Sequence, residues 1–301
     1  MKSSLHILLT LLLRAVLPLA FAGSMLCADT VGYWRFESGN FTADSSGNSL
    51  TLGKGGSGGD NLLQTTLAAE GAGANFPKTI PQTGATNSTA LSWNGVGLNY
   101  KVEDNALFAL TEGVTIEAFV NLSALPTGKS ASIAAQRGNS TATGWGFFVS
   151  TTGELVFQYQ SASGQSWGAA SATWESLASG LTLTAGKDYY VAFAMDLADT
   201  SVSGATFYLQ NLSDGGDIQT VSVTHSFTTI NHPAKRLYIG TSENSDVFSG
   251  LLDEVRLSNT RLSQDQLLVS SIPEPAAAAA FVCAGMLAFV VAARRFRSSG
   301  S

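Results

Sequence analysis

The chain has 301 residues, of which 45% are hydrophobic and only 13% are charged. Residues 29–272 hold 11 Lys and Arg against 21 Asp and Glu, a net charge near −10, which excludes the basic surface that nucleic acid binding requires. The two cysteines, Cys27 and Cys283, lie outside that portion, so it has neither a disulfide framework nor a thiolate metal site. Its stability must come from burial of apolar surface, and a chain of this length can bury enough.

Residues 1–28 have the layout of a secretory signal peptide. A lysine near the start is followed by an apolar stretch that begins at residues 7–13, and small residues stand before both candidate cleavage points. Cleavage after Ala22 satisfies the small-x-small rule, whereas cleavage after Ala28 would place the mature end directly before the first strand. Both sites stay open. A retained membrane helix is disfavoured because Arg14 interrupts the apolar stretch.

Short segments of alternating or β-rich composition dominate residues 29–271, which form the predicted domain. Most are separated by Gly, Asn, Ser or Asp turns, and this pattern predicts an all-β, two-sheet antiparallel sandwich of the jelly-roll type. Trp34 and Trp93 lie on such segments and are expected in the core. The predicted strands span residues 31–36, 90–93, 114–122, 132–136, 145–150, 155–160, 189–197, 205–212, 219–227, 236–241 and 250–257.

Two regions of the domain differ from this pattern. Residues 37–88 are rich in Gly, Ala, Ser, Thr and Asn, and we expect most of them to form a long surface loop. Residues 263–269 are the one convincing helical stretch, because Ser263 can cap the helix with Gln266 in the capping-box position.

The C-terminal end predicts a transmembrane helix. Residues 276–293 form an uncharged apolar run, which at about 1.5 Å per residue reaches roughly 27 Å, enough for the hydrocarbon core of a bilayer. A cluster of arginines follows at once and would hold that end in the cytoplasm. A buried core helix is disfavoured, since this segment has no polar face and the arginines beside it would lose their water.

A short motif stands directly before this run, and with it residues 272–301 resemble the PEP-CTERM sorting signals. The motif, the apolar span and the arginine cluster occur in the order of that family, and the two prolines enforce an extended backbone. The resemblance implies recognition by an exosortase-type processing enzyme, removal of the tail and delivery to the cell envelope, surface or extracellular matrix. The residues that carry it are Pro273, Glu274, Pro275, Arg294, Arg295 and Arg297.

The middle of the chain, from about residue 31 to 269, resembles the LamG-like members of the concanavalin A-like jelly-roll superfamily. The resemblance implies two curved antiparallel sheets, often a glycan or protein ligand, and often one bound calcium ion. The sequence departs from the family in the long loop before residue 90 and in Phe119, which stands where a Trp is familiar. The segments that carry the resemblance are GYWRFE, ADSSGNSL, ALSWNG, GVTIEAFVNL, LTAGKDYYVAFAMD, ATFYLQN and LYIGTSENSDVFSGLLDEVRLSNTRLSQDQL.

The resemblance also implies candidate ligands for one structural calcium ion, Asp44 and Asp253, because hard cations prefer carboxylate and loop carbonyl oxygens. Both could meet if the first and last strands are neighbours. The alternative for Asp44 is an Asx-turn, in which the side chain bonds the backbone two residues on. The alternative for Asp253 is a strand carboxylate paired with Arg256 or with a backbone amide.

Aromatic side chains in a Gly/Ser-rich stretch are candidates for stacking against a sugar. They are Trp145, Trp167 and Trp174, with Tyr159 beside Gln158 on a strand. The alternative for each ring is packing in the core or at its rim.

The sequence does not favour an enzyme. Jelly-roll glycosidases need two carboxylates at a fixed separation, yet Glu117 is alone on its strand, and Asp253 and Glu254, as neighbours on a strand, are expected on opposite faces. The GQSWG segment at 164–168 lacks the strand before and the helix after that a nucleophile elbow needs. The SALPTGKS segment at 123–130 is expected to be a hairpin loop and not a phosphate loop.

Two histidines of the domain, His225 and His232, are seven residues apart and have no evident third ligand, so zinc is not expected.

The sequence therefore predicts a non-catalytic exported protein whose sandwich binds an extracellular polysaccharide or another matrix component, anchored by its C-terminal helix before processing. Two alternatives stay open. One is a purely structural envelope or biofilm-matrix protein, and the other is a jelly-roll enzyme that acts on glycans.

Overall fold

The computed structural model describes residues 30–55, 63–95, 99–137, 144–161, 173–242 and 245–271. The signal peptide and the C-terminal helix predicted from the sequence lie outside these ranges, as do the PEP-CTERM motif and Trp167. Within the described ranges, no helix has the length and apolar character needed to cross a membrane.

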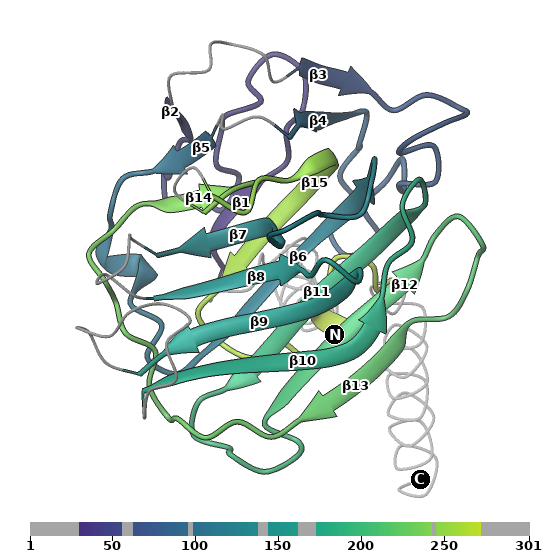
Figure 1. Ribbon diagram of the computed structural model, residues 1–301. Helices are drawn as coiled ribbons and strands as arrows, with labels where there is room; N and C mark the ends of the chain where they lie inside the picture. Colours follow the sequence, from purple (N-terminus) through teal and green to yellow (C-terminus); the bar gives the residue numbers. More distant parts are fainter. Residues whose placement is uncertain are drawn as a thin grey trace, which may run out of the picture.

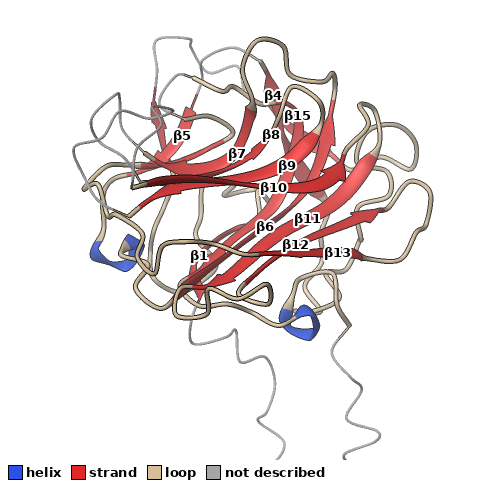
Figure 2. Ribbon diagram, turned by 60° about the horizontal axis from the view of Figure 1, so that its bottom comes forward, coloured by secondary structure: helices blue, strands red, loops and turns tan. Residues whose placement is uncertain are grey.

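Two antiparallel sheets pack face to face, which confirms the predicted sandwich (Figures 1 and 2). Sheet A contains, in spatial order, β13 (Gln219–Val223), β12 (Ala205–Asn211), β11 (Asp188–Asp196), β6 (Gly113–Leu122), β15 (Ser249–Ser258), β4 (Thr89–Asn94) and β3 (Leu63–Thr66), and β1 (Thr30–Trp34) also pairs with β15. Sheet B contains β10 (Trp174–Thr182), β9 (Glu154–Gln160), β8 (Trp145–Val149), β7 (Ala131–Gln136), β14 (Leu237–Ile239), β5 (Asn99–Val102) and β2 (Gly53–Gly55).

Every predicted strand region contains a strand. The sequence missed β2, β3 and β5, which are short, and β10, whose β-branched content is low. The main core lies between the sheets and contains Trp34 and Trp93, as predicted. Phe157 of sheet B stacks on Phe193 of sheet A with ring centroids 4.1 Å apart.

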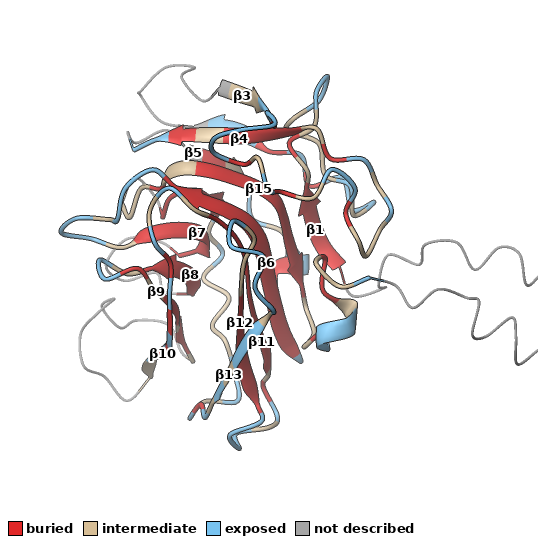
Figure 3. Cartoon of the chain, turned by 90° about the vertical axis from the view of Figure 1, so that its right-hand side faces the viewer, coloured by how far each residue is buried: buried red, intermediate tan, exposed pale blue. Residues whose placement is uncertain are grey.

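A second hydrophobic cluster covers the outer face of sheet A, opposite the main core. Phe76 and Ile80, from the segment predicted to be a surface loop, are buried there against Phe119 and Tyr190. Residues 37–88 do form long irregular connections, but residues 67–88 are a cover and not a surface loop. Figure 3 shows these loops and the end of the described chain on the side of sheet A that faces away from sheet B.

The predicted helix at 263–269 is a single 3-10 turn, Gln264–Gln266. The capping box between Ser263 and Gln266 is present as expected. The helix ends early because the backbone of Leu267 is extended, and the side chains of Leu267 and Leu268 are both buried in the cover of sheet A.

Described residues from three of the connections between the sheets lie close together at one end of the sandwich: Gly95 after β4, residues 124–130 between β6 and β7, and residues 245–247 between β14 and β15. The segment 123–130 is therefore not a hairpin loop, because the strands on its two sides belong to different sheets.

Candidate functional site

The outer face of sheet B carries no second hydrophobic cluster among the described residues, unlike that of sheet A. Side chains alternate along each strand, and the set opposite the core forms rows across the sheet. The central row contains Ala135, Gly146, Gln158 and Ser176. The next row contains Phe148, Val156 and Ala178. Polar and apolar side chains thus alternate on the outer face of sheet B, and no described segment covers this face as residues 67–88 cover sheet A.

Gln160 and Trp174 are cross-strand partners at one side of this face. The side chain of Gln160 is fully buried, and neither its Oε1 nor its Nε2 has a hydrogen-bond partner among the residues that the structure describes. Trp174 is only half-buried. A buried amide without partners is uncommon in proteins, because each lost hydrogen bond costs about 1–3 kcal/mol. A buried water molecule could satisfy this amide, whereas its full burial closes it to a ligand.

Arg137 lies over the middle of the same face. Its guanidinium carbon is 4.8 Å from the centre of the Phe148 ring, and its Nη2 donates to Ser242 Oγ at 2.9 Å and also forms an ion pair with Asp246. Burial lowers the pKa of Arg137, and the carboxylate of Asp246 opposes that shift. No local sequence pattern indicates this contact, since Arg137 and Asp246 are 109 residues apart.

Trp145 and Tyr159, predicted to stack on a ligand, are fully buried on the inner face of sheet B. Trp145 stacks on Phe157 at a centroid distance of 6.1 Å. The hydroxyl of Tyr159 donates to Glu175 Oε2 at 2.6 Å, and burial is the main reason that its pKa is raised. Neither ring can meet a sugar, so that prediction was wrong for these two residues. Of the predicted aromatic set, Trp174 is the one that the structure describes on the outer face.

Asp44 forms the Asx-turn considered above, since the backbone N–H of Ser46 donates to Asp44 Oδ1 at 2.8 Å. Its carboxylate also accepts from the backbone N–H groups of Tyr33 and Leu50 at 3.0 and 2.9 Å. Asp253 accepts from Asn87 Nδ2 at 2.8 Å and from the backbone N–H of Glu254 at 3.0 Å. Both carboxylates thus face N–H donors, which a calcium ion would have to displace.

Burial is also the largest cause of a pKa of Asp253 well above its usual range, and this favours the neutral acid over a charged ligand. No three His, Cys, Asp or Glu side chains of the described chain are grouped so that they could hold a metal ion. The two residues therefore do not fit a calcium ion as they are placed, and the ion stays a prediction from the resemblance.

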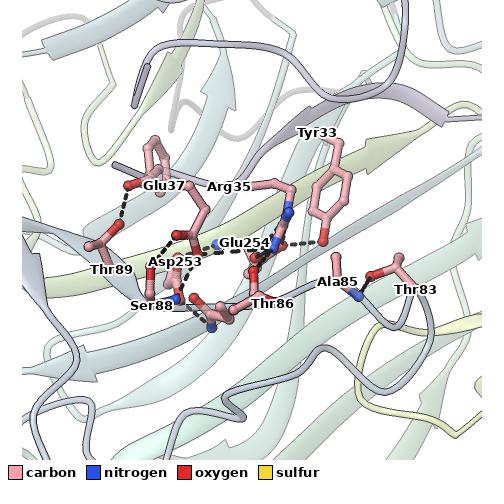
Figure 4. A network of polar contacts seen from close by, with 12 residues as sticks. Tyr33, Arg35, Glu37, Thr83, Ala85, Thr86, Ser88, Thr89, Asp253 and Glu254 are labelled. Carbon is pink, nitrogen blue, oxygen red and sulfur yellow. Dashed lines mark hydrogen bonds and ion pairs between the residues drawn. The ribbon is translucent and has the colours of Figure 1, made fainter. Parts of the chain in front are cut away.

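Asp253 and Glu254 lie on the same, outer side of sheet A and not on opposite faces. The register of β15 against β6 shifts between Asp253 and Arg256, and Glu254 has a φ of 50°, which marks a β-bulge. Glu254 accepts from Arg35 Nη2 at 2.8 Å and from the hydroxyl of Tyr33. Figure 4 shows this network, with Glu37 beside it.

The pKa of Glu254 is raised because burial outweighs its ion pair with Arg35. The two adjacent carboxylates are fully buried under the cover. They belong to the packing of sheet A and are closed to a substrate.

Glu117 is also buried on the outer face of sheet A. It pairs with Arg256, whose Nε donates to Glu117 Oε1 at 2.6 Å, and it accepts from the hydroxyl of Tyr190 at 2.5 Å and from the backbone N–H of Leu268 at 2.8 Å. Arg256 therefore pairs with Glu117 and not with Asp253. This cluster fixes the end of the described chain onto sheet A.

The two histidines have separate structural contacts. His225 is buried, and its ring nitrogens lie 3.1 and 2.9 Å from the backbone carbonyls of Phe227 and Asp196. His232 Nε2 lies 2.8 Å from Asp104 Oδ1. The structure does not bring the two rings into one site.

These two layers and the polar outer face of sheet B are the architecture of a lectin-type β-sandwich. The Laminin G 3 model of the concanavalin A-like lectin/glucanases superfamily matches residues 94–268, more than half of the chain. The chain belongs to this superfamily. None of the curated proteins matches the sequence.

Solved structures of the same fold are distant in sequence. The binding domain of Paraclostridial Mosquitocidal Protein 1 is 14% identical with a TM-score of 0.52, and the match covers 80% of this chain and 51% of that one. Domain 4 of AbnA, an extracellular GH43 arabinanase from Geobacillus stearothermophilus solved with arabinotriose, is 16% identical over 80% of this chain and 97% of that one, with a TM-score of 0.47. The receptor binding domain of botulinum neurotoxin mosaic serotype C/D is 13% identical over 80% of this chain and 50% of that one, with a TM-score of 0.49. The chain thus matches about half the length of the two toxin domains.

Proposed function

We propose that this protein is a non-catalytic, exported surface or matrix protein that binds carbohydrate on the outer face of sheet B. The observation that carries the proposal is the half-buried ring of Trp174 on the same face as the partly exposed amide of Gln158 and the exposed hydroxyl of Ser176. Membership of a superfamily of lectins and glucanases supports a glycan as the ligand.

The chemistry of this face suits a sugar. An indole ring offers an apolar surface to the C–H groups of a pyranose, and side-chain amides can both donate to and accept from its hydroxyls. Gln158, two residues before Gln160, lies in the central row beside the exposed Ser176. A ligand that stacks on Trp174 would thus reach the amide of Gln158 and the hydroxyl of Ser176.

Binding is favoured over hydrolysis. A glycosidase needs two carboxyl groups about 5–5.5 Å or 6.5–9.5 Å apart across the scissile bond, and the two rows described above contain none. The carboxylate of Asp246, close to this face, is occupied by Arg137. Asp253 and Glu254, which are adjacent, are buried between sheet A and its cover.

The test is a glycan array probed with the full chain in detergent, followed by calorimetric titration of the glycans that bind. We expect Trp174→Ala and Gln158→Ala each to weaken binding by about tenfold, since each removes a direct contact. Val202→Ala and Gln219→Ala remove exposed side chains from sheet A and its turns, and both should bind as the native protein does.

Absence of binding to any glycan would contradict the proposal and would favour a purely structural matrix protein. If Trp174→Ala and Gln158→Ala bound glycans no more weakly than the two control variants, the binding contact would lie elsewhere.

Export and sorting complete the proposal. The signal peptide, the apolar span and the Pro273-Glu274-Pro275 motif support delivery to the envelope or matrix by an exosortase-type enzyme. In that setting the ligand is an extracellular polysaccharide.

A further inference from the structure

Described residues from three connections between the sheets line a cavity of about 440 Å³. It lies between the 123–130 segment, the turn that precedes β15, and Gly95 at the end of β4. The volume is within the range of roughly 300–1,000 Å³ that is usual for small-ligand pockets. The outer face of sheet B is a separate surface, since none of Gln158, Gln160 and Trp174 lines this cavity.

The wall of the cavity combines apolar and hydroxyl groups. Leu125 is 40% exposed and stands beside Pro126 and Val247. Thr127 and Ser130 add hydroxyls, and Ser123 and Ser249 bond each other at 2.7 Å next to them. A sugar ring presents apolar C–H groups and polar hydroxyl groups. Exposed apolar side chains next to hydroxyl groups can contact both.

The cavity is lined by one cation, Lys129, and one anion, Asp246, and the anion is paired with Arg137. Lys129 Nζ is exposed and donates to Ser245 Oγ at 3.0 Å, and it forms no ion pair with a carboxylate that the structure describes. Asp246 also lines the cavity, but its carboxylate is turned to Arg137 and to Ser242 Oγ, which donates to it at 2.6 Å. The ammonium of Lys129 is thus the charge left for a ligand in this part of the chain.

We propose that this cavity binds an acidic saccharide, with the sugar carboxylate on Lys129 and the ring against Leu125 and Pro126. The inference deepens the proposed function, since it rests on carbohydrate as the ligand and adds a second site with its own preference for charge. Attraction between the ammonium and a carboxylate is strengthened at low ionic strength and is screened by salt.

The experiment is calorimetric titration of the full chain with trigalacturonate, and with the methyl ester of the same trisaccharide, which has the same rings without the charges. We expect trigalacturonate to bind, the ester to bind at least about tenfold more weakly, and affinity to fall as salt is added. Lys129→Met should lose about tenfold in affinity, and Lys129→Arg should keep most of it. Lys187→Met is the matched control, because Lys187 is exposed and pairs with Asp214 away from the cavity.

The outcomes separate the two sites. If trigalacturonate binding is lost in Trp174→Ala but kept in Lys129→Met, the cavity proposal is overturned and the face of sheet B stands. If neutral glycans bind and trigalacturonate does not, the cavity proposal again fails alone. If trigalacturonate binds through Lys129 while no neutral glycan binds, the cavity stands and the face of sheet B fails. A thermal melt of Lys129→Met that matches the native protein excludes unfolding as the cause of a loss.

Discussion

Asp253 and Glu254 show how burial controls charge at the residue scale. Both are closed to solvent, and burial is the largest cause of the raised pKa of each. The ion pair of Glu254 with Arg35 lowers its pKa only in part. Asp253 has an amide and a backbone N–H as partners and no cation among the contacts described above. The folded protein therefore binds protons at these sites more readily than the unfolded chain does.

This difference sets the sign of a pH effect. A folded-state pKa above the unfolded value of roughly 4 means that the native state is most favoured below that value, and its stability falls as the pH rises through the raised pKa. Asp253→Asn removes one of the two titrations. We expect the variant to lose less stability than the native protein as the pH rises above about 4, by about 1.4 kcal/mol for each unit of pKa shift removed.

Urea unfolding across this pH range measures the effect. Asp217→Asn is the control, because it neutralises an exposed carboxylate and should leave the native pH dependence unchanged. The same slope in the native protein and in Asp253→Asn would contradict the argument.

At the scale of elements, the segment of residues 67–88 acts as part of the core. Phe76 is 1% exposed and packs on Phe119 with a centroid distance of 5.8 Å. The same segment bonds the end of the described chain, since the backbone N–H of Gln82 donates to Leu268 O at 3.2 Å. The segment is therefore packed against sheet A, although its backbone is irregular.

Phe76→Ala should destabilise the protein by about 3 kcal/mol, the usual cost of emptying a buried aromatic site. Chemical denaturation measures this loss in the free energy of unfolding. Val202→Ala is the control, and it should cost about 0.5 kcal/mol or less because the Val202 side chain is 62% exposed. If the two variants were equally stable, the segment would not be a cover.

The sequence predicted the sandwich and its long strands because alternation depends on local pattern alone. It could not predict which of two faces is inner. Trp145 and Phe147 alternate with Phe148, and either set could have been the core. The β-bulge at Glu254 places the carboxylates of Asp253 and Glu254 on the same side of sheet A, where simple alternation predicts opposite faces. The contact of Arg137 with Asp246, and the cavity between three connections, join residues far apart in the chain, so no local pattern reveals them.

At the scale of the whole molecule, the proposed sorting step can be tested apart from folding. The motif at residues 273–275 lies after the last described residue, so we expect its replacement by three alanines to leave the sandwich intact. If the proposed exosortase-type enzyme recognises this motif, the variant should keep its C-terminal segment and stay in the membrane fraction.

Immunoblots against an epitope tag added after residue 301 measure this retention. Three alanines at residues 298–300 are the control, and there the tag should be cleaved off as in the native chain. Loss of the tag from both variants would show that the motif is not the recognition element.

The position of the last described residues also sets how the molecule is presented. Residues 262–268 pack on the outer face of sheet A, and in Figure 3 both ends of the described chain leave from that side. Under the proposed C-terminal anchoring, we expect a chain that continues from residue 271 to place the covered face of sheet A nearer the cell. The outer face of sheet B would then be turned to the surroundings, where an extracellular polymer reaches it directly.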